Sequence, residues 1–405
     1  MKNLGLFLML GVFILSCKDS SEDAAPAHLF TITTSDLHDL DAWIVLRDDA
    51  SGELIEARQL SDNKEEIFDS PKQISTLAVT LFYPNLHVLP ITKLKNVDVY
   101  RGVKAGSEWT APEIPFGSSG FFNFTYGITI NNLPDKNAIT FSSTSGELYS
   151  KYAEESKSSF KGGVVGRVGE TRHLVVVSTP TQDPKYLWLE NLVDGESRTV
   201  SYNDFKSFDK VINISFPAGD AYSNVAATDN IKIPYGFATS YVNPFHDDAV
   251  FNSGISEFRI GYLNEFASYR TLFITGPFRH VSLGAPAAIN YVGTSGYSAT
   301  AGSNLVKDYT VTATSDFVYS GTLFASYTVD LYTEFRYFGP KGVTTFYDPL
   351  TPEILEKYSI DMSKLSYQYT DFMVKGRSYD DFVESVFDPE HTSTKAFEEN
   401  FVRVE

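Results

Sequence analysis

The chain has 405 residues and a formal net charge of −18, with 51 acidic side chains against 33 basic ones. A surface this acidic repels phosphate backbones and anionic lipid headgroups, which argues against nucleic-acid binding and against membrane attachment through a basic patch. A single cysteine excludes an internal disulfide, so stability must come from burial. The 31 Phe and 24 Tyr residues favour pleated sheet.

The first apolar stretch of the chain has the composition of a secretory signal. Lys2 supplies a positive charge, and residues 4–15 form an uncharged apolar run that is too short to span a bilayer. The run ends in an aliphatic pair and Ser16, directly before Cys17, the only cysteine. The alternative interpretation is a buried N-terminal strand or helix with an incidental cysteine.

The order aliphatic, aliphatic, small, cysteine resembles the lipobox of bacterial lipoproteins, in which a diacylglycerol is attached to the thiol and the peptide is cut just before it. The resemblance covers only the start of the chain. It implies a signal peptide over residues 1–16, a lipid with palmitate-type acyl chains on Cys17, and a lipid anchor in the outer membrane with the body at the cell surface or the periplasmic face. The membrane is then an expected partner through the N-terminal lipid.

Residues 17–27 are small or charged and lack apolar periodicity, which predicts a flexible tether. Lys18 followed by acidic residues resembles the export tag on surface lipoproteins of some Gram-negative bacteria. An ordinary solvated linker is the alternative.

Beyond the tether, short alternating runs predict an all-β fold of mainly antiparallel β-sandwich modules. Residues 43–47 and 54–58 flank a turn that contains Gly52, which predicts a hairpin. Residues 122–130 place apolar side chains at every second position, which is the period of a half-buried strand. The fold class is therefore all-β.

The spacing around residues 32–54 recurs around residues 128–148. Ile32, Leu37, Asp39 and Ala42 reappear as Ile128, Leu133, Asp135 and Ala138, and each set is followed by a strand and by Ser-Gly-Glu-Leu. We interpret this as a duplicated β-sandwich module. The expected domains are one module over residues 28–104, a second over 105–216, and a β-rich C-terminal domain over 217–405.

The C-terminal region contains the longest alternating run, from Leu323 to Tyr337. A straight strand of that length would span about 50 Å, so we expect a bend or bulge within it, with Leu323, Tyr327, Leu331 and Phe335 facing inward. Two short helices are expected after it, the first capped by Thr351 and the second by Ser378.

Candidate chemistry in the sequence is sparse. No Gly-x-Ser-x-Gly is present, and Ser158 to Lys161 matches Ser-x-x-Lys without the partner motifs of a β-lactamase-like enzyme. His246, Asp247 and Asp248 follow a proline and are weak candidates for a Ca²⁺ or Zn²⁺ site. The loop over residues 36–41 offers carboxylates and a histidine, but a solvated loop explains it better. No cofactor is expected.

Trp109 lies in a junction outside any clear strand, where an exposed indole can stack on a sugar or anchor a partner. The favoured alternative is a core plug between the first and second modules. We expect a lipid-anchored envelope lipoprotein that is a non-enzymatic binding or structural component, with an envelope protein or a glycan as partner. The alternative is a carbohydrate-binding or carbohydrate-active surface lipoprotein.

Overall fold

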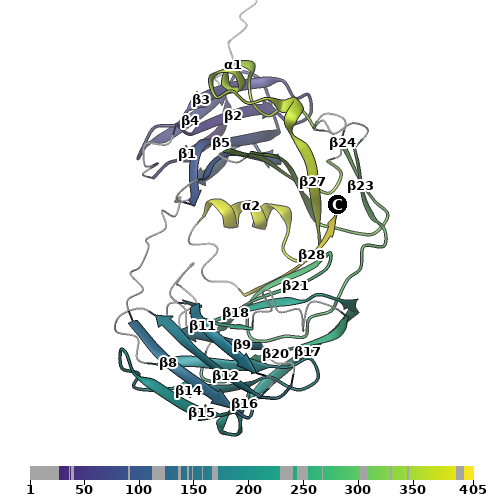
Figure 1. Cartoon of the computed structure of the whole chain (residues 1–405). Helices are drawn as coiled ribbons and strands as arrows, with labels where there is room; N and C mark the ends of the chain where they lie inside the picture. The colour runs from purple at the N-terminus through teal and green to yellow at the C-terminus, as the bar shows by residue number, and fades with distance from the viewer. Residues whose placement is uncertain are drawn as a thin grey trace, which may run out of the picture.

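The computed structural model covers the 405-residue chain and describes it from residue 27 to residue 405 with gaps. The gaps are residues 36, 38–40, 90–91, 112–123, 136–137, 144–145, 148, 157, 167–171, 229–239, 244–253, 267, 302–305, 307–308, 329–330, 344–345 and 389–395. Cys17 and the segment expected to be a tether up to residue 26 lie outside the described residues. The expected fold class is confirmed, because strands dominate and two short α-helices lie near the C-terminus (Figure 1).

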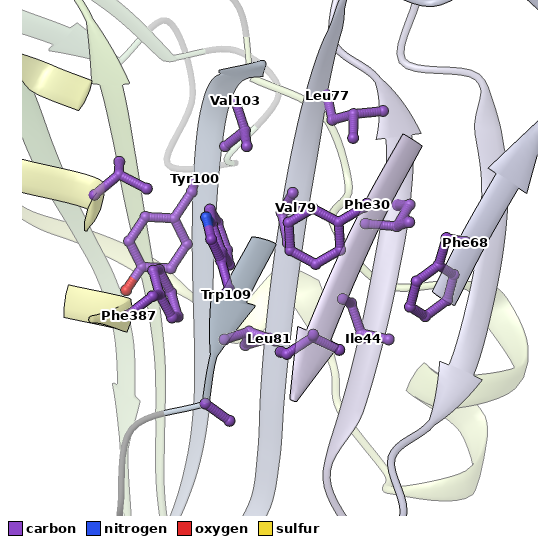
Figure 2. Close-up of a cluster of buried hydrophobic side chains, with 14 of the residues drawn as sticks. Phe30, Ile44, Phe68, Leu77, Val79, Leu81, Tyr100, Val103, Trp109 and Phe387 are labelled. Carbon is purple, nitrogen blue, oxygen red and sulfur yellow. The ribbon is translucent and has the colours of Figure 1, made fainter. Parts of the chain in front are cut away.

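The first module is a sandwich of two sheets. Its described strands are β1 (Ala27–Thr33), β2 (Trp43–Asp48), β3 (Leu54–Gln59), β4 (Glu65–Ser70), β5 (Thr76–Leu89), β6 (Thr92–Lys104) and β7 (Ser107–Thr110). One sheet has the order β4-β1-β7, and the facing layer has the order β3-β2-β5-β6. Apolar side chains from both layers, such as Phe30 and Phe68 from the first and Ile44 and Val79 from the second, form one core (Figure 2).

The second module repeats this order. Its described strands are β8 (Phe124–Asn131), β9 (Ala138–Ser143), β10 (Gly146–Glu147), β11 (Tyr149–Ser156), β12 (Ser159–Gly166), β13 (His173–Ser178), β14 (Lys185–Leu189), β15 (Ser197–Ser201) and β16 (Lys206–Ser207), with a 3-10 turn, η1 (Tyr202–Asp204), before the last. The order β12-β8-β15 matches β4-β1-β7, and β10-β9-β13-β14 matches β3-β2-β5-β6. In both modules the first strand pairs in parallel with the last of these, Ile32 with Trp109 and Ile128 with Arg198. The two modules therefore share one strand order in these two layers.

The remaining described strands form two further groups, which the sequence did not reveal. The third group contains β17 (Lys210–Gly219), β18 (Tyr222–Thr228), β19 (Ser240–Asn243), β20 (Ile255–Tyr262), β21 (Ser268–Thr275) and β22 (Phe278–Gly284). The fourth contains β23 (Tyr297–Ala301), β24 (Tyr309–Ala313), β25 (Tyr319–Tyr327), β26 (Leu331–Pro340), β27 (Ser366–Lys375) and β28 (Phe397–Val404). Their orders β19-β18-β21-β22 and β26-β25-β27-β28 repeat the four-strand order of the modules.

Twelve strands of the described residues join into one sheet made of three such four-strand units. The antiparallel pair β22–β28 joins the third unit to the fourth, and the parallel pair β26–β6 joins the fourth to the first module. The first module and the C-terminal region share a sheet, β7 belongs with β1 in the first module, and β17 pairs with β20 beyond the expected boundary at residue 216. Local periodicity does not show which sheet edges meet.

The alternating run from Leu323 to Tyr337 is a hairpin and not one bent strand. β25 and β26 pair antiparallel from Tyr319 with Pro340 to Tyr327 with Tyr332. The Thr328 hydroxyl donates to the Leu331 carbonyl at 2.9 Å and accepts from its N–H at 3.2 Å, which closes the reversal without a glycine. Leu323 and Phe335 are buried as expected, Leu331 is half-buried, and Tyr327 is 50% exposed, which contradicts its expected inward position.

Both expected helix caps are confirmed. Helix α1 (Pro352–Lys357) begins after Thr351, whose hydroxyl accepts from the Ile354 N–H. Helix α2 (Tyr379–Phe387) begins after Ser378, whose hydroxyl accepts from the Asp381 N–H at 3.1 Å. Figure 1 shows α2 beside the first module, in the space between its strands and those of the third group. Within the described residues, no helix is both long and apolar enough to cross a membrane.

Candidate functional site

An open groove of about 830 Å³ lies on the outer face of β4-β1-β7. We call this the first-module groove. Its floor is formed by β1, β4 and β7, and the C-terminal end of α2 closes one side. The lining residues are His28, Thr31, Thr33, Glu65, Ile67, Ser107, Glu108, Trp109, Thr110, Glu384, Phe387 and Asp388.

Strand register explains why these side chains share a face. Thr31 lies opposite Ile67 of β4 and beside Glu108 of β7, and Thr33 lies opposite Glu65 and beside Thr110. Side chains that are paired across neighbouring strands point to the same side of a sheet. The groove floor therefore carries hydroxyl groups in the middle and carboxylates at both edges.

Trp109 is part of the core beneath the groove and not an exposed platform. Its indole is 5% exposed and stacks on Phe387 of α2, with ring centroids 3.8 Å apart and an interplanar angle of 6° (Figure 2). Phe30 and Tyr100 meet it edge to face at 4.9 Å and 5.5 Å. This is the environment that the core alternative predicts, although the plug joins the first module to α2 and not to the second module. At 5% exposure the indole offers little surface to a ligand in the groove.

The groove is acidic. Glu65, Glu108, Glu384 and Asp388 are all exposed, and the last two lie at the C-terminal end of α2, where the backbone carbonyls add negative potential. His28 is the only histidine, lysine or arginine among the lining residues. Such a lining favours a ligand that carries a positive group and donates hydrogen bonds to hydroxyl and carboxylate oxygens.

Behind the floor, ion pairs to the buried carboxylate of Glu66 link β4 to β3. The Glu66 side chain is 5% exposed, and its carboxylate receives Lys64 Nζ at 2.8 Å and Arg58 Nη1 at 3.0 Å. Burial acts to raise the pKa of Glu66, but these two hydrogen bonds outweigh it and the pKa is lowered. These ion pairs hold β4 in register under the exposed Glu65 and Ile67.

A hydroxyl, an imidazole and a carboxylate lie in line at one end of the groove. His28 Nε2 is 3.2 Å from Thr31 Oγ1, and His28 Nδ1 is 3.4 Å from Asp69 Oδ1. This is the order in which some hydrolases orient a nucleophile. Here both contacts are long and the His28 and Asp69 side chains are 41% and 48% exposed, so water competes for them. The arrangement orients His28 over the floor but does not present an activated nucleophile.

The other sequence candidates are not brought into this groove. His246, Asp247 and Asp248 lie outside the described residues, and no group of three or more His, Cys, Asp or Glu side chains suited to a metal ion occurs within them. A second feature that sequence reasoning missed is the tip of the β25–β26 hairpin. There Tyr327 and Tyr332 are 50% and 38% exposed and pack edge to face with centroids 5.0 Å apart. The sequence could have predicted this pair only if the chain reversal after Thr328 had been recognised, because that reversal places Tyr327 opposite Tyr332 at the exposed end of the hairpin.

No family model matches the chain, and no curated protein matches it. Among solved structures, the chain was aligned with SGBP-B of the Bacteroides ovatus mixed-linkage glucan utilization locus, in complex with a mixed-linkage heptasaccharide. The alignment covers 93% of this chain and 94% of that one at 8% identity, with a TM-score of 0.10. A TM-score this low does not indicate a shared fold.

Proposed function

We propose that this protein is a lipid-anchored component of the cell envelope whose folded body is a binding protein, with the first-module groove as its binding site. The lipobox-like stretch ending in Cys17 supports the anchor. The observation that carries the binding role is the groove itself, a hollow of about 830 Å³ that combines carboxylates, hydroxyls and the exposed Ile67 on a rigid sheet.

The chemistry of the lining defines the ligand class. Four exposed carboxylates surround a floor of threonine hydroxyls, so the ligand carries amino or guanidinium groups. The shape is open and the carboxylates are solvated, so each ion pair contributes modestly and several must act together. Binding should therefore weaken steeply as salt is added.

The direct test uses fluorescently labelled tetralysine as the probe and anisotropy as the readout. Glu108→Gln combined with Glu384→Gln should weaken binding at least tenfold at low salt. The matched control is Glu190→Gln combined with Glu257→Gln, which removes the same charge from exposed positions on other strands and loops. If both double variants bind tetralysine equally well, the groove is not the site.

The anchor is tested by fractionation. Cys17→Ser should leave a precursor that is neither lipidated nor cleaved before residue 17, while a chain that starts at Ser20 behind an ordinary cleavable signal should be recovered free of membranes. Recovery of the truncated chain in washed membranes would show a second anchor and contradict the proposal.

A glycan-binding role is the second candidate, and the exposed tyrosine pair favours it. Tyr327 and Tyr332 present ring surface at the hairpin tip, and the Tyr327 hydroxyl lies 3.4 Å from Glu334 Oε1, which supplies a hydrogen-bond acceptor for sugar hydroxyls. Affinity electrophoresis in gels that contain soluble β-glucan would test it. The Tyr327→Ser, Tyr332→Ser double variant should lose any retardation that the native protein shows. Equal mobility with and without the polysaccharide would exclude that glycan class.

A further inference from the structure

We propose that the outer edge of β4 accepts an extended, basic segment of a partner protein as an additional antiparallel strand. This goes beyond the first-module groove, because it concerns the backbone edge of the sheet and stands whether or not the groove binds a cationic ligand.

In the second module, the outer edge of the strand that corresponds to β4 pairs with a further strand. There β12, the counterpart of β4, is covered along its outer edge by β11, which pairs with it antiparallel from Tyr149 with Val165 to Ser156 with Ser159. Among the strands that the structure describes in the first module, none occupies the corresponding place, and β4 is the outermost strand of its sheet. The segment that follows Ser-Gly-Glu-Leu pairs with β12 as β11 in the second module, whereas in the first module it pairs with β2 as β3. Among the described strands, the outer edge of β4 is therefore left without a paired strand.

Apolar surface lies along the vacant edge. Ile67 is 49% exposed and Leu54 is 43% exposed, and these are two of only five large apolar side chains exposed in the described part of the chain. A hollow of about 210 Å³ separates the ends of β3 and β4 and is lined in part by Leu54, Ile55 and Ile74. An edge strand with exposed apolar side chains is a ready template for a further strand.

The backbone at this edge is only loosely covered. The Ile67 carbonyl receives Arg58 Nη1 at 3.4 Å, which is a long contact. The same guanidinium is held much closer by Glu56 at 2.5 Å and Glu66 at 3.0 Å. Arg58 therefore keeps its ion pairs when an incoming N–H takes the Ile67 carbonyl.

Charge selects the occupant. Glu65 and Asp69 flank Ile67 on the exposed side of β4, so cross-strand lysine or arginine residues would pair with them. A second copy of this chain carries a net charge of −18 and is repelled. The tether, with Asp19, Glu22 and Asp23 against Lys18, is also unsuited. A basic segment with alternating apolar residues fits, in the mode in which peptides add to sheet edges.

The test uses an eight-residue peptide of alternating valine and lysine, equal in length to β11, with a fluorophore at its N-terminus. The purified full-length protein should bind it, and Ile67→Lys, which places a positive charge on the edge, should weaken binding at least tenfold. Val193→Lys adds the same charge to another exposed apolar position, 62% exposed in the second module, and should change binding less than twofold. An alternating valine and glutamate peptide should not bind. Circular dichroism of each variant verifies that the fold is retained.

Three results would overturn the proposal. They are equal affinity of the Ile67→Lys and Val193→Lys variants, equal binding of the acidic peptide, and a dimer of the protein that Ile67→Lys dissolves, which would make a second copy the occupant. The Glu108→Gln, Glu384→Gln variant separates this proposal from the groove. It should lose tetralysine binding but keep the valine-lysine peptide within threefold.

Discussion

In the first module, the parallel neighbour of β1 carries Trp109 opposite Ile32, whereas in the second module the parallel neighbour of β8 carries Arg198 opposite Ile128. Trp109 is buried against Phe387 of a helix that comes from the far end of the chain. Arg198 instead donates to the carbonyls of Glu190 and Asn191 next to its own strand, at 2.7 Å and 2.9 Å. The strand beside β1 is thus covered by a helix from a distant part of the chain, whereas the strand beside β8 is held by hydrogen bonds to neighbouring residues.

The edges of the two modules differ in the same way. In the first module β6 continues into the twelve-stranded sheet through β26. In the second module β14, on the side away from β13, pairs only with the two-residue β16 within the described residues. Conversely, β12 pairs with β11, whereas no strand that the structure describes pairs with the outer edge of β4. Both modules therefore depend on the C-terminal region, in different ways. The first module shares a sheet with it, whereas the second packs Leu174 and Val176 of β13 against the core of the third group.

The largest expected effect is at Trp109. Trp109→Ala should destabilise the protein by about 3–5 kcal/mol, because it leaves a cavity among Phe30, Tyr100 and Phe387. Arg198→Ala at the matched position should cost only about 1–2 kcal/mol, the value of hydrogen bonds from a partly exposed charged group. Urea unfolding followed by far-UV circular dichroism measures both. Equal costs would mean that the two positions close their modules in the same way.

A second difference is a buried histidine. His173 of β13 is fully buried and lies 3.1 Å from the Tyr126 hydroxyl. Burial lowers the pKa of His173 from 6.5 to about 4. The native state therefore holds the neutral ring, and between pH 6.5 and pH 4 the unfolded chain binds the extra proton.

The stability contribution of the neutral His173 is complete above pH 6.5 and is lost as the pH falls toward 4, on the order of 3 kcal/mol. His173→Gln keeps a side chain that can hydrogen bond to Tyr126 and cannot titrate. Its melting temperature should fall less than that of the native protein between pH 7 and pH 4.5. A parallel fall in both proteins would show that another group accounts for the acid sensitivity.

The smallest expected change in stability is the difference between alanine substitutions at two turn glycines. Gly52 in the first module and Gly195 in the second have φ values of +75° and +77°, where alanine is strained by about 1–2 kcal/mol. A Cβ at Gly52 would also lie 3.3 Å from the Tyr347 ring, whereas a Cβ at Gly195 would meet nothing within 4 Å. Gly52→Ala should therefore cost slightly more than Gly195→Ala in thermal unfolding. The reverse order would show that the Tyr347 contact adjusts freely.

Local signals predicted much of the fold. Strand alternation predicted the all-β class, and the hydroxyls of Thr351 and Ser378 marked both helix starts. The hairpin reversal was missed because no glycine or proline lies between Thr328 and Leu331 and the apolar alternation continues from one strand into the next. The parallel β6–β26 pair was missed because it joins residues such as Asp98 and Arg336, 238 positions apart, whose ion pair has no local pattern.

The candidate groove was predicted only through Trp109, and only as a junction residue. Its lining comes from β1, β4, β7 and the end of α2, and no sequence window contains more than a part of that set. Glu65, Glu108 and Glu384 are ordinary surface carboxylates in the sequence. They become a site because the register of three strands and one helix placement brings them to the same face.

The contrast between a covered β12 and an open β4 is most directly tested by amide hydrogen exchange on the purified full-length protein, with and without the valine-lysine peptide. In the free protein, the outward-facing amides of β4 should exchange much faster than those of β12, whose edge is paired with β11. The peptide should slow exchange in β4 over Glu65 to Asp69 and leave β12 unchanged. Equal protection of β4 and β12 in the free protein, or protection by the peptide that appears elsewhere and not in β4, would contradict the account.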